Sequence, residues 1–333
     1  MSTHQATYYT TSDSRFFLGT VALINSLRLT GHRGEVVVLD LGLSDRQRLR
    51  LAPVATVEEP AVTPRAFPKA LPAPGRTRGL IVLIDSDMLV VASLQPLLEA
   101  AERGRICVFP DPDDRWFEDW QPTFALKAPL RRERYVNAGF IALSVEQWPW
   151  LLERWAEVNE LIPLEPFART ESDPFNELDP FRDTDQDALN AVLMSEVPAG
   201  AIHVEPEWAE AHPGALLDVR IESERTLACA DRGRQVTILH QAGSPKAWQP
   251  RGWKRDFRQS YVRLLPRLLW GDDVQLRLQH REAPLWLRPG APGTLGFRAI
   301  RSLHATPGAK RAAKAIRAAG RSLRSKWSSP AHE

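Results

Sequence analysis

Short apolar runs alternate with helix-period segments in the first part of the chain. The runs over 6–11 and 35–41 are rich in β-favouring residues and predict strands. Between them, 15–30 places apolar side chains three or four residues apart, which predicts a helix, and Ser44 is placed to cap a short helix over 45–51. Strand followed by helix, twice over, favours a parallel α/β sheet.

The same two patterns continue to about residue 270. Irregular, polar or Pro-rich segments over 52–76 and 111–134 interrupt them, and the second of these has the character of a loop that faces an acceptor or of an ordinary connection. The pattern predicts further strands over 80–84, 88–91, 105–109, 135–144, 202–204 and 235–239, and further helices over 93–103, 146–161, from 185 onward after a capping Thr184, and over 256–270.

The run LIVLI over 80–84 is unbroken, as in a strand buried on both faces of a sheet, and it ends at Asp85, Ser86 and Asp87. Two carboxylates beside a buried strand cost several kcal/mol unless something offsets their charge. A divalent cation would offset both, at the strand end where α/β sheets collect ligands. A solvated turn is the alternative for this pattern on its own.

Composition narrows the class of protein. The 333 residues are 43% hydrophobic, enough for a large core, and the two cysteines, Cys107 and Cys229, have no metal-ligand spacing. The N-terminal segment lacks the order of a signal peptide, and no run of about 18 apolar residues occurs, so we expect a cytoplasmic protein that does not span a membrane.

Charge divides the chain into two parts. From Arg251 onward there are 18 Lys and Arg against 5 Asp and Glu, whereas the whole chain has a formal charge of only +2. We therefore expect a catalytic domain over 1–250 and a basic, Pro-containing helical extension over 251–333.

Five short motifs follow one another in the first 250 residues. In chain order they are Thr10-Thr11-Ser12-Asp13, Asp85-Ser86-Asp87, Asn137-Ala138-Gly139, Asp185-Gln186-Asp187 with Leu189-Asn190, and His240-x-x-Gly243-x-x-Lys246-x-Trp248. Together they resemble glycosyltransferase family 8, the retaining group that includes glycogenin and the bacterial lipopolysaccharide galactosyl- and glucosyltransferases. The resemblance runs from about Ala6 to Trp248, and Ala247 stands where family members commonly have proline.

The resemblance implies an A-type glycosyltransferase fold, which is a Rossmann-like mixed, mainly parallel sheet flanked by helices, here with a basic helical appendage. It implies a transferase that moves a hexosyl group from a nucleoside-diphosphate sugar, with uridine the expected base, to a glycan or glycolipid hydroxyl. Asp85, Asp87 and His240 would hold Mn²⁺ or Mg²⁺, and the imidazole favours manganese.

The resemblance also assigns the remaining site residues. Gly243 would let the backbone approach the phosphates, and Lys246 would place a charge on the leaving diphosphate. The donor-binding set is Thr10, Thr11, Ser12, Lys69, Ser86, Asn137, Gly243 and Lys246, with Lys69 a surface lysine in the alternative interpretation.

Gln186 occupies the family position beneath the anomeric carbon, and Asp185 would face the donor sugar. A neutral amide is a poor nucleophile, which favours front-face attack with help from the leaving phosphate. Either Asp185 or Asp187 could still serve as the nucleophile. The structural alternative for both acids is that they stabilise the N-terminus of a helix.

The C-terminal segment separates apolar and basic positions at helical spacing, and no acid interrupts them. Ala309, Ala312, Ala313, Ile316, Gly320, Leu323 and Trp327 fall on one side, and Lys310, Arg311, Lys314, Arg317, Arg321, Arg324 and Lys326 on the other. This pattern is typical of a helix on an anionic membrane surface, here the inner face of the plasma membrane. A solvated tail is the alternative, and the acidic first part of the chain argues against nucleic acid.

Two other functions compete with the transferase. A sugar-nucleotidyltransferase also combines a nucleotide-binding sheet with a metal held by carboxylates. It requires a Gly-rich basic segment after the first strand, however, and 11–16 contains no glycine. The second competing function is that of a degenerate, non-catalytic module that binds a nucleotide sugar. Ala247, in place of the family's proline, is the one feature that favours it.

Overall fold

The computed structural model describes residues 5–60, 71–72, 77–162, 178–290 and 295–296. Within them a seven-stranded sheet has the order β3-β2-β1-β4-β7-β6-β8. Only β7 runs antiparallel to its neighbours β4 and β6, so the sheet is mixed and mainly parallel, as predicted. Its strands are β1 (Thr7–Ser12), β2 (Val36–Asp40), β3 (Thr56–Glu58), β4 (Leu80–Ile84), β6 (Ile106–Pro110), β7 (Val136–Ser144) and β8 (Ile202–Val204).

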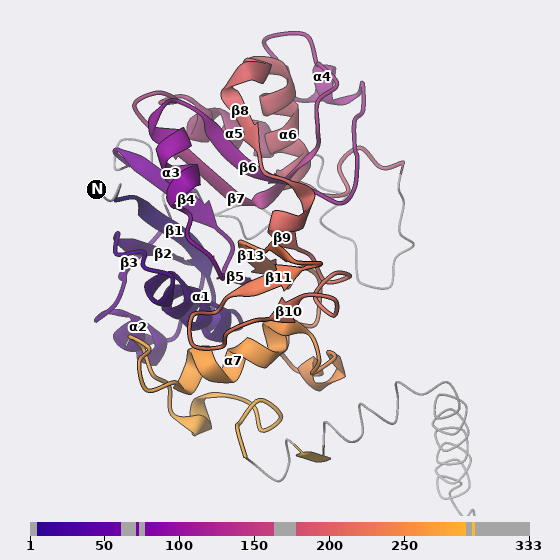
Figure 1. The fold of residues 1–333 in the computed structure, drawn as a ribbon. Helices are drawn as coiled ribbons and strands as arrows, with labels where there is room; N and C mark the ends of the chain where they lie inside the picture. The colour runs from indigo at the N-terminus through magenta and orange to yellow at the C-terminus, as the bar shows by residue number, and fades with distance from the viewer. Residues whose placement is uncertain (1–4, 61–70, 73–76, 163–177, 291–294, 297–333) are drawn as a thin grey trace, which may run out of the picture.

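Side chains of the central strands alternate between two hydrophobic cores, because successive residues of a strand point to opposite faces. In β4, Val82 and Ile84 pack with α1 (Phe17–Leu29), while Ile81 and Leu83 pack with α5 (Leu151–Asn159) and α6 (Asp185–Glu196). Helices therefore cover both faces of the sheet (Figure 1). The other α-helices of the described residues are α2 (Asp45–Leu51), α3 (Gln95–Glu102), α4 (Trp120–Thr123) and α7 (Ser260–Trp270).

Local sequence signals fixed some boundaries and missed others. Ser44 caps α2 with a full capping box to Gln47, as predicted. Thr184 does precede α6, but it makes no side-chain cap and has a φ of 43°, so the predicted capping is wrong. The segment 52–76 is not wholly irregular, because β3 pairs in parallel with β2.

A second, three-stranded sheet brings distant segments together in the order β5-β13-β9. Strand β5 (Met88–Val90) follows the acidic turn and pairs antiparallel with β13 (Ile238–His240), so that His240 lies opposite Met88. Strand β9 (Glu210–Ala211) lies on the other side of β13. A third sheet contains β10 (Arg220–Ile221), β11 (Cys229–Asp231) and β12 (Arg234–Gln235), so the strand predicted over 235–239 is divided between two sheets.

The described residues after 250 pack against the rest of the molecule. Helix α7 lies beside α1 (Figure 1), and the Asn25 side chain donates to the carbonyls of Leu268 and Leu276 at 2.7 and 2.8 Å. The predicted division at residue 250 stays a prediction. Most of the basic segment lies outside the described residues. Among the described helices, none has the length and apolarity needed to cross a bilayer.

Candidate active site

The site lies where the ends of several strands meet. Strands β1, β4 and β6 run in one direction, so their carboxyl ends share an edge of the sheet with the first residues of the antiparallel β7. A cavity of about 530 Å³ opens there. Its lining includes Thr11, Ser12, Asp85, Ser86, Asp87, Asp111, Asn137, Asp183, Asp185, Gln186, His240, Gly243 and Lys246.

The acidic turn and His240 converge because of the strand register. Asp85 follows β4, and Asp87 immediately precedes β5, whose partner β13 ends at His240. One carboxylate oxygen from each acid and one imidazole nitrogen all lie within 4.8 Å of one another. The three side chains that the sequence predicted as metal ligands are thus adjacent in the fold.

Opposite charges surround the buried Asp87. Its carboxylate accepts from the Lys246 ammonium and lies 3.5 Å from His240 Nε2. Burial alone would raise the pKa of Asp87, but Lys246 and His240 together lower it below its usual range. His240 Nδ1 lies 2.8 Å from the carboxylate of the buried Glu210. Burial opposes the charged imidazole, yet Asp87 and Glu210 raise the pKa of His240 to about 10.

Two glycines allow this packing. A Cβ on Gly19 of α1 would lie 2.4 Å from the Ser86 carbonyl and 2.7 Å from the Trp248 ring. A Cβ on Gly139 of β7 would collide with the Met88 side chain and would lie 3.2 Å from Asp85 Oδ2. Helix α1 and strand β7 can therefore approach the acidic turn only because these positions have no side chain.

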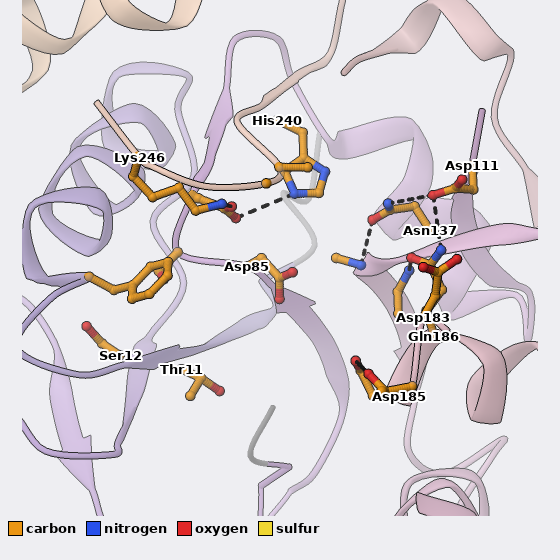
Figure 2. A pocket seen from close by; sticks show the side chains of 18 of the residues that line it. Thr11, Ser12, Asp85, Asp111, Asn137, Asp183, Asp185, Gln186, His240 and Lys246 are labelled. Carbon is orange, nitrogen blue, oxygen red and sulfur yellow. Dashed lines mark hydrogen bonds and ion pairs between the residues drawn. The ribbon is translucent and has the colours of Figure 1, made fainter. Parts of the chain in front are cut away.

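The far side of the cavity is organised around Asp111 (Figure 2). Asp111 Oδ2 accepts from the amides of Asn137 and Gln186, both at 3.1 Å. The other end of each amide accepts a backbone N–H: Gly139 donates to Asn137 Oδ1 at 2.7 Å, and Ala138 donates to Gln186 Oε1 at 3.0 Å. Because a backbone N–H can only donate, these contacts fix which end of each amide is the oxygen.

Asp185 and Asp187 differ in their surroundings. Asp185 lines the cavity, whereas Asp187 is fully buried and accepts from Arg115 Nε at 3.0 Å and from the Tyr135 hydroxyl at 2.8 Å. Burial raises the pKa of Asp187 to about 6 against the lowering effect of Arg115. Asp187 is therefore part of the support beneath the site, and of the two only Asp185 lines the cavity.

The structure brings most of the remaining predicted residues to the cavity. Ser12 also accepts from the Thr20 hydroxyl at 2.7 Å, and Gly243 has a φ of 71°. Thr10 is buried within β1 and is absent from the lining, and Lys69 lies outside the described residues.

Ala247 makes a backbone hydrogen bond that proline could not make. Its N–H donates to Gln241 Oε1 at 3.1 Å, and proline has no N–H. The turn is held further by Trp248, whose Nε1 donates to the Arg15 carbonyl at 2.8 Å.

Sequence reasoning missed Asp111 and Glu210. Asp111 directly follows the apolar strand β6, as Asp85 follows β4, so the same rule would have found it. Glu210 begins a two-residue strand after a polar segment, and no local pattern indicates its contact with His240.

Comparison with solved structures identifies the fold. The apo structure of the bifunctional glycosyltransferase WbbM is similar at a TM-score of 0.51 and 17% identity, over 83% of this chain and 51% of that one. This chain thus spans about half the length of WbbM.

Two other solved structures are similar at lower scores. Galactosyltransferase LgtC in complex with donor and acceptor sugar analogues has a TM-score of 0.48 and 15% identity, over 78% of this chain and 95% of its own. The glycosyltransferase GlyE of Streptococcus pneumoniae TIGR4 has a TM-score of 0.44 and 13% identity, over 79% of this chain and 60% of its own.

No protein-family model matches the sequence, and no curated protein matches it. At these identities the likeness to solved structures concerns the fold, and it agrees with the mixed α/β architecture described above. The chain has the A-type glycosyltransferase fold.

Proposed function

We propose that the protein is a metal-dependent, retaining glycosyltransferase of the family 8 type. It would move a hexosyl group from a nucleoside-diphosphate sugar, with UDP as the expected carrier, to a hydroxyl of a glycan or glycolipid. The observation that carries the proposal is the convergence of Asp85, Asp87 and His240 ligand atoms within 4.8 Å at the edge of a large cavity.

The donor set fits a divalent ion. Two carboxylates supply the oxygen ligands that hard cations take, and His240 directs Nε2 toward Asp87 while Nδ1 faces Glu210. The imidazole favours Mn²⁺ over Mg²⁺. When bound, such an ion would neutralise the charge that develops on the leaving diphosphate.

The remaining lining residues divide between the two ends of the donor. Ser86 of the acidic turn, with Gly243 and Lys246, lines the cavity and would contact the diphosphate, while Thr11 and Ser12 would contact the nucleoside. Thr10 would act only through the β1 backbone, because its side chain is buried, and Lys69 stays a prediction for the donor side.

The amides and Asp185 would face the sugar. Asp111 and two backbone N–H groups hold Gln186 and Asn137, so both amides are oriented before a ligand arrives. Gln186 is neutral and Asp187 is buried, which leaves Asp185 as the candidate nucleophile of that helix. We favour front-face attack, in which the leaving phosphate deprotonates the acceptor.

The nucleotidyltransferase alternative finds little support after β1. The Asp13 carboxylate accepts the N–H groups of Arg15 and Phe16 at 2.7 and 3.0 Å, so those two donors are not open to a phosphate. A non-catalytic binding module would share the same donor site and would differ only in turnover.

Hydrolysis of UDP-sugars without acceptor tests the proposal. Asp87→Asn keeps the side-chain shape but removes the charge, so we expect turnover to fall by about 100-fold or more with the circular dichroism spectrum unchanged. Asp273→Asn, an exposed acid distant from the cavity, is the matched control and should be fully active. Undiminished turnover of Asp87→Asn would refute its role.

The basic C-terminal segment, which lies outside the described residues, is proposed as a peripheral attachment to anionic membranes. Each Lys or Arg near such a surface contributes roughly 1 kcal/mol. Flotation with anionic liposomes should recover the full chain and lose a chain that ends at Pro292. Equal flotation of both would exclude this attachment.

A further inference from the structure

Glu210 lies beneath the site in a position that only the tertiary structure creates. Strand β9 pairs in parallel with β13, with Glu210 opposite Ile238, two residues before His240. The two side chains then meet, and Glu210 Oε1 lies 2.8 Å from His240 Nδ1. We propose that Glu210 is a positioning residue that fixes the ring and tautomer of His240 for binding a divalent cation, an inference that rests on the proposed function.

The contact with Glu210 determines which nitrogen of His240 carries the shared proton. A carboxylate can only accept hydrogen bonds, so the contact at 2.8 Å places the proton on His240 Nδ1. A cation that binds the ring displaces the proton on Nε2, and with the other proton held on Nδ1 the lone pair then lies on Nε2. Nε2 is the nitrogen that faces Asp87, at 3.5 Å from Oδ1. The geometry thus presents the lone pair on the side of the two acids.

Glu210 is itself held in place. Only 3% of the residue is exposed, and its other oxygen lies 3.5 Å from His212 Nε2. The two imidazole rings tilt against each other with centroids 5.4 Å apart. The carboxylate therefore stands between two rings and has little freedom to turn away from His240. Its charge also makes the His240 ring a more basic ligand.

The same atoms could instead belong to a second metal site that includes His212. Ligand atoms of Glu210, His212 and His240 also lie within 4.8 Å of one another. An ion held by those three would require His212 as a ligand, whereas a positioning role for Glu210 does not. Replacement of His212 therefore distinguishes the two.

The test is a titration of the full chain with Mn²⁺, followed by electron paramagnetic resonance, with Mg²⁺ as competitor. Glu210→Gln keeps the shape but loses the charge, and its amide can present N–H to His240. We expect Mn²⁺ to bind 10–100-fold more weakly, and the preference for Mn²⁺ over Mg²⁺ to shrink, because imidazole contributes more to manganese. A merely structural lesion would not change that ratio.

Glu196→Gln is the matched control, because it also removes the charge of a carboxylate that has a buried partner, Arg154 at 2.8 Å, and neither residue lines the cavity. It should bind Mn²⁺ within about twofold of the wild type. His212→Asn removes one neighbour of Glu210 but no ligand, so its loss of affinity should be clearly smaller than that of Glu210→Gln. If Glu210→Gln does not fold, Glu210→Asp keeps the charge on a shorter arm and should lower the same ratio.

Three results would overturn the inference. If Glu210→Gln binds Mn²⁺ with wild-type affinity and wild-type preference over Mg²⁺, Glu210 has no positioning role, and the proposed function is unaffected. An equal loss in His212→Asn would place the ion between Glu210, His212 and His240. No Mn²⁺ binding by the wild-type chain would reject the proposed function as well.

Discussion

Single residues show how far one rule reaches. An acid at the end of an apolar strand is a candidate ligand, and this rule identified Asp85 and Asp87 from the sequence. Asp111 satisfies the same rule, but it was missed because 111–134 was interpreted as a loop. Glu210 could not be predicted, because its contact with His240 depends on a pairing of strands 28 residues apart in the chain. Side-chain polarity marks candidates, but tertiary contacts select among them.

His32 gives a prediction about stability and pH. Its Nε2 accepts from the Leu94 N–H at 3.1 Å, which a protonated ring cannot do, and its Nδ1 lies 3.0 Å from the Tyr8 hydroxyl. Burial, with Arg28 and Arg33 nearby, lowers the pKa of His32 to about 4 from 6.5. The unfolded chain therefore binds the proton more tightly, and stability is lost as the pH falls from about 6.5 to 4.

Urea unfolding at pH 7 and pH 4 measures this effect. The lowered pKa corresponds to about 3 kcal/mol of unfolding free energy across that range. His32→Gln should be less stable at pH 7 and should lose less than the wild type on acidification. Identical losses in both proteins would show that His32 does not carry the effect.

At the scale of elements, the sequence predicted which helices and strands form better than it predicted which strands pair. The central strands, α1 and the capped α2 lie within a residue or two of the predicted bounds, because their periods and caps are local. The very short strands β3 and β9 were missed, and so was the pairing of β5 with β13. That pairing, which aligns His240 with Met88, creates the candidate metal site and comes from no local pattern.

The contact between α1 and the acidic turn can be tested at Gly19. Gly→Ala inside an open helix stabilises it by about 1 kcal/mol, but a Cβ here would lie 2.4 Å from the Ser86 carbonyl. We expect Gly19→Ala to lower the unfolding free energy by about 1–3 kcal/mol in urea titrations.

Gly200→Ala is the control, because a Cβ there meets nothing within 4 Å. Its unfolding free energy should change by no more than about 0.5 kcal/mol. A stabilised Gly19→Ala would mean that α1 does not approach the turn as closely as described.

At the scale of the molecule, the two faces of one sheet serve different parts of the site. The core that contains α1 and α7 supports the acidic turn and Trp248, and the core that contains α5 and α6 supports Gln186 and the Asp187 network. The extension predicted after 250 stays a prediction as a unit of its own. Its helix α7 packs on α1 through residues such as Asn25, 243 positions from Leu268. Contacts at that separation leave no periodic signal.

The central claim is that Asp85, Asp87 and His240 hold one divalent ion together with a nucleoside diphosphate. Calorimetric titration of the full chain with UDP, with and without Mn²⁺, tests it most directly. The account predicts UDP binding that requires Mn²⁺, is lost in Asp87→Asn and is kept in Asp273→Asn. UDP binding that is equally strong without the metal, or no UDP binding at all, would contradict it.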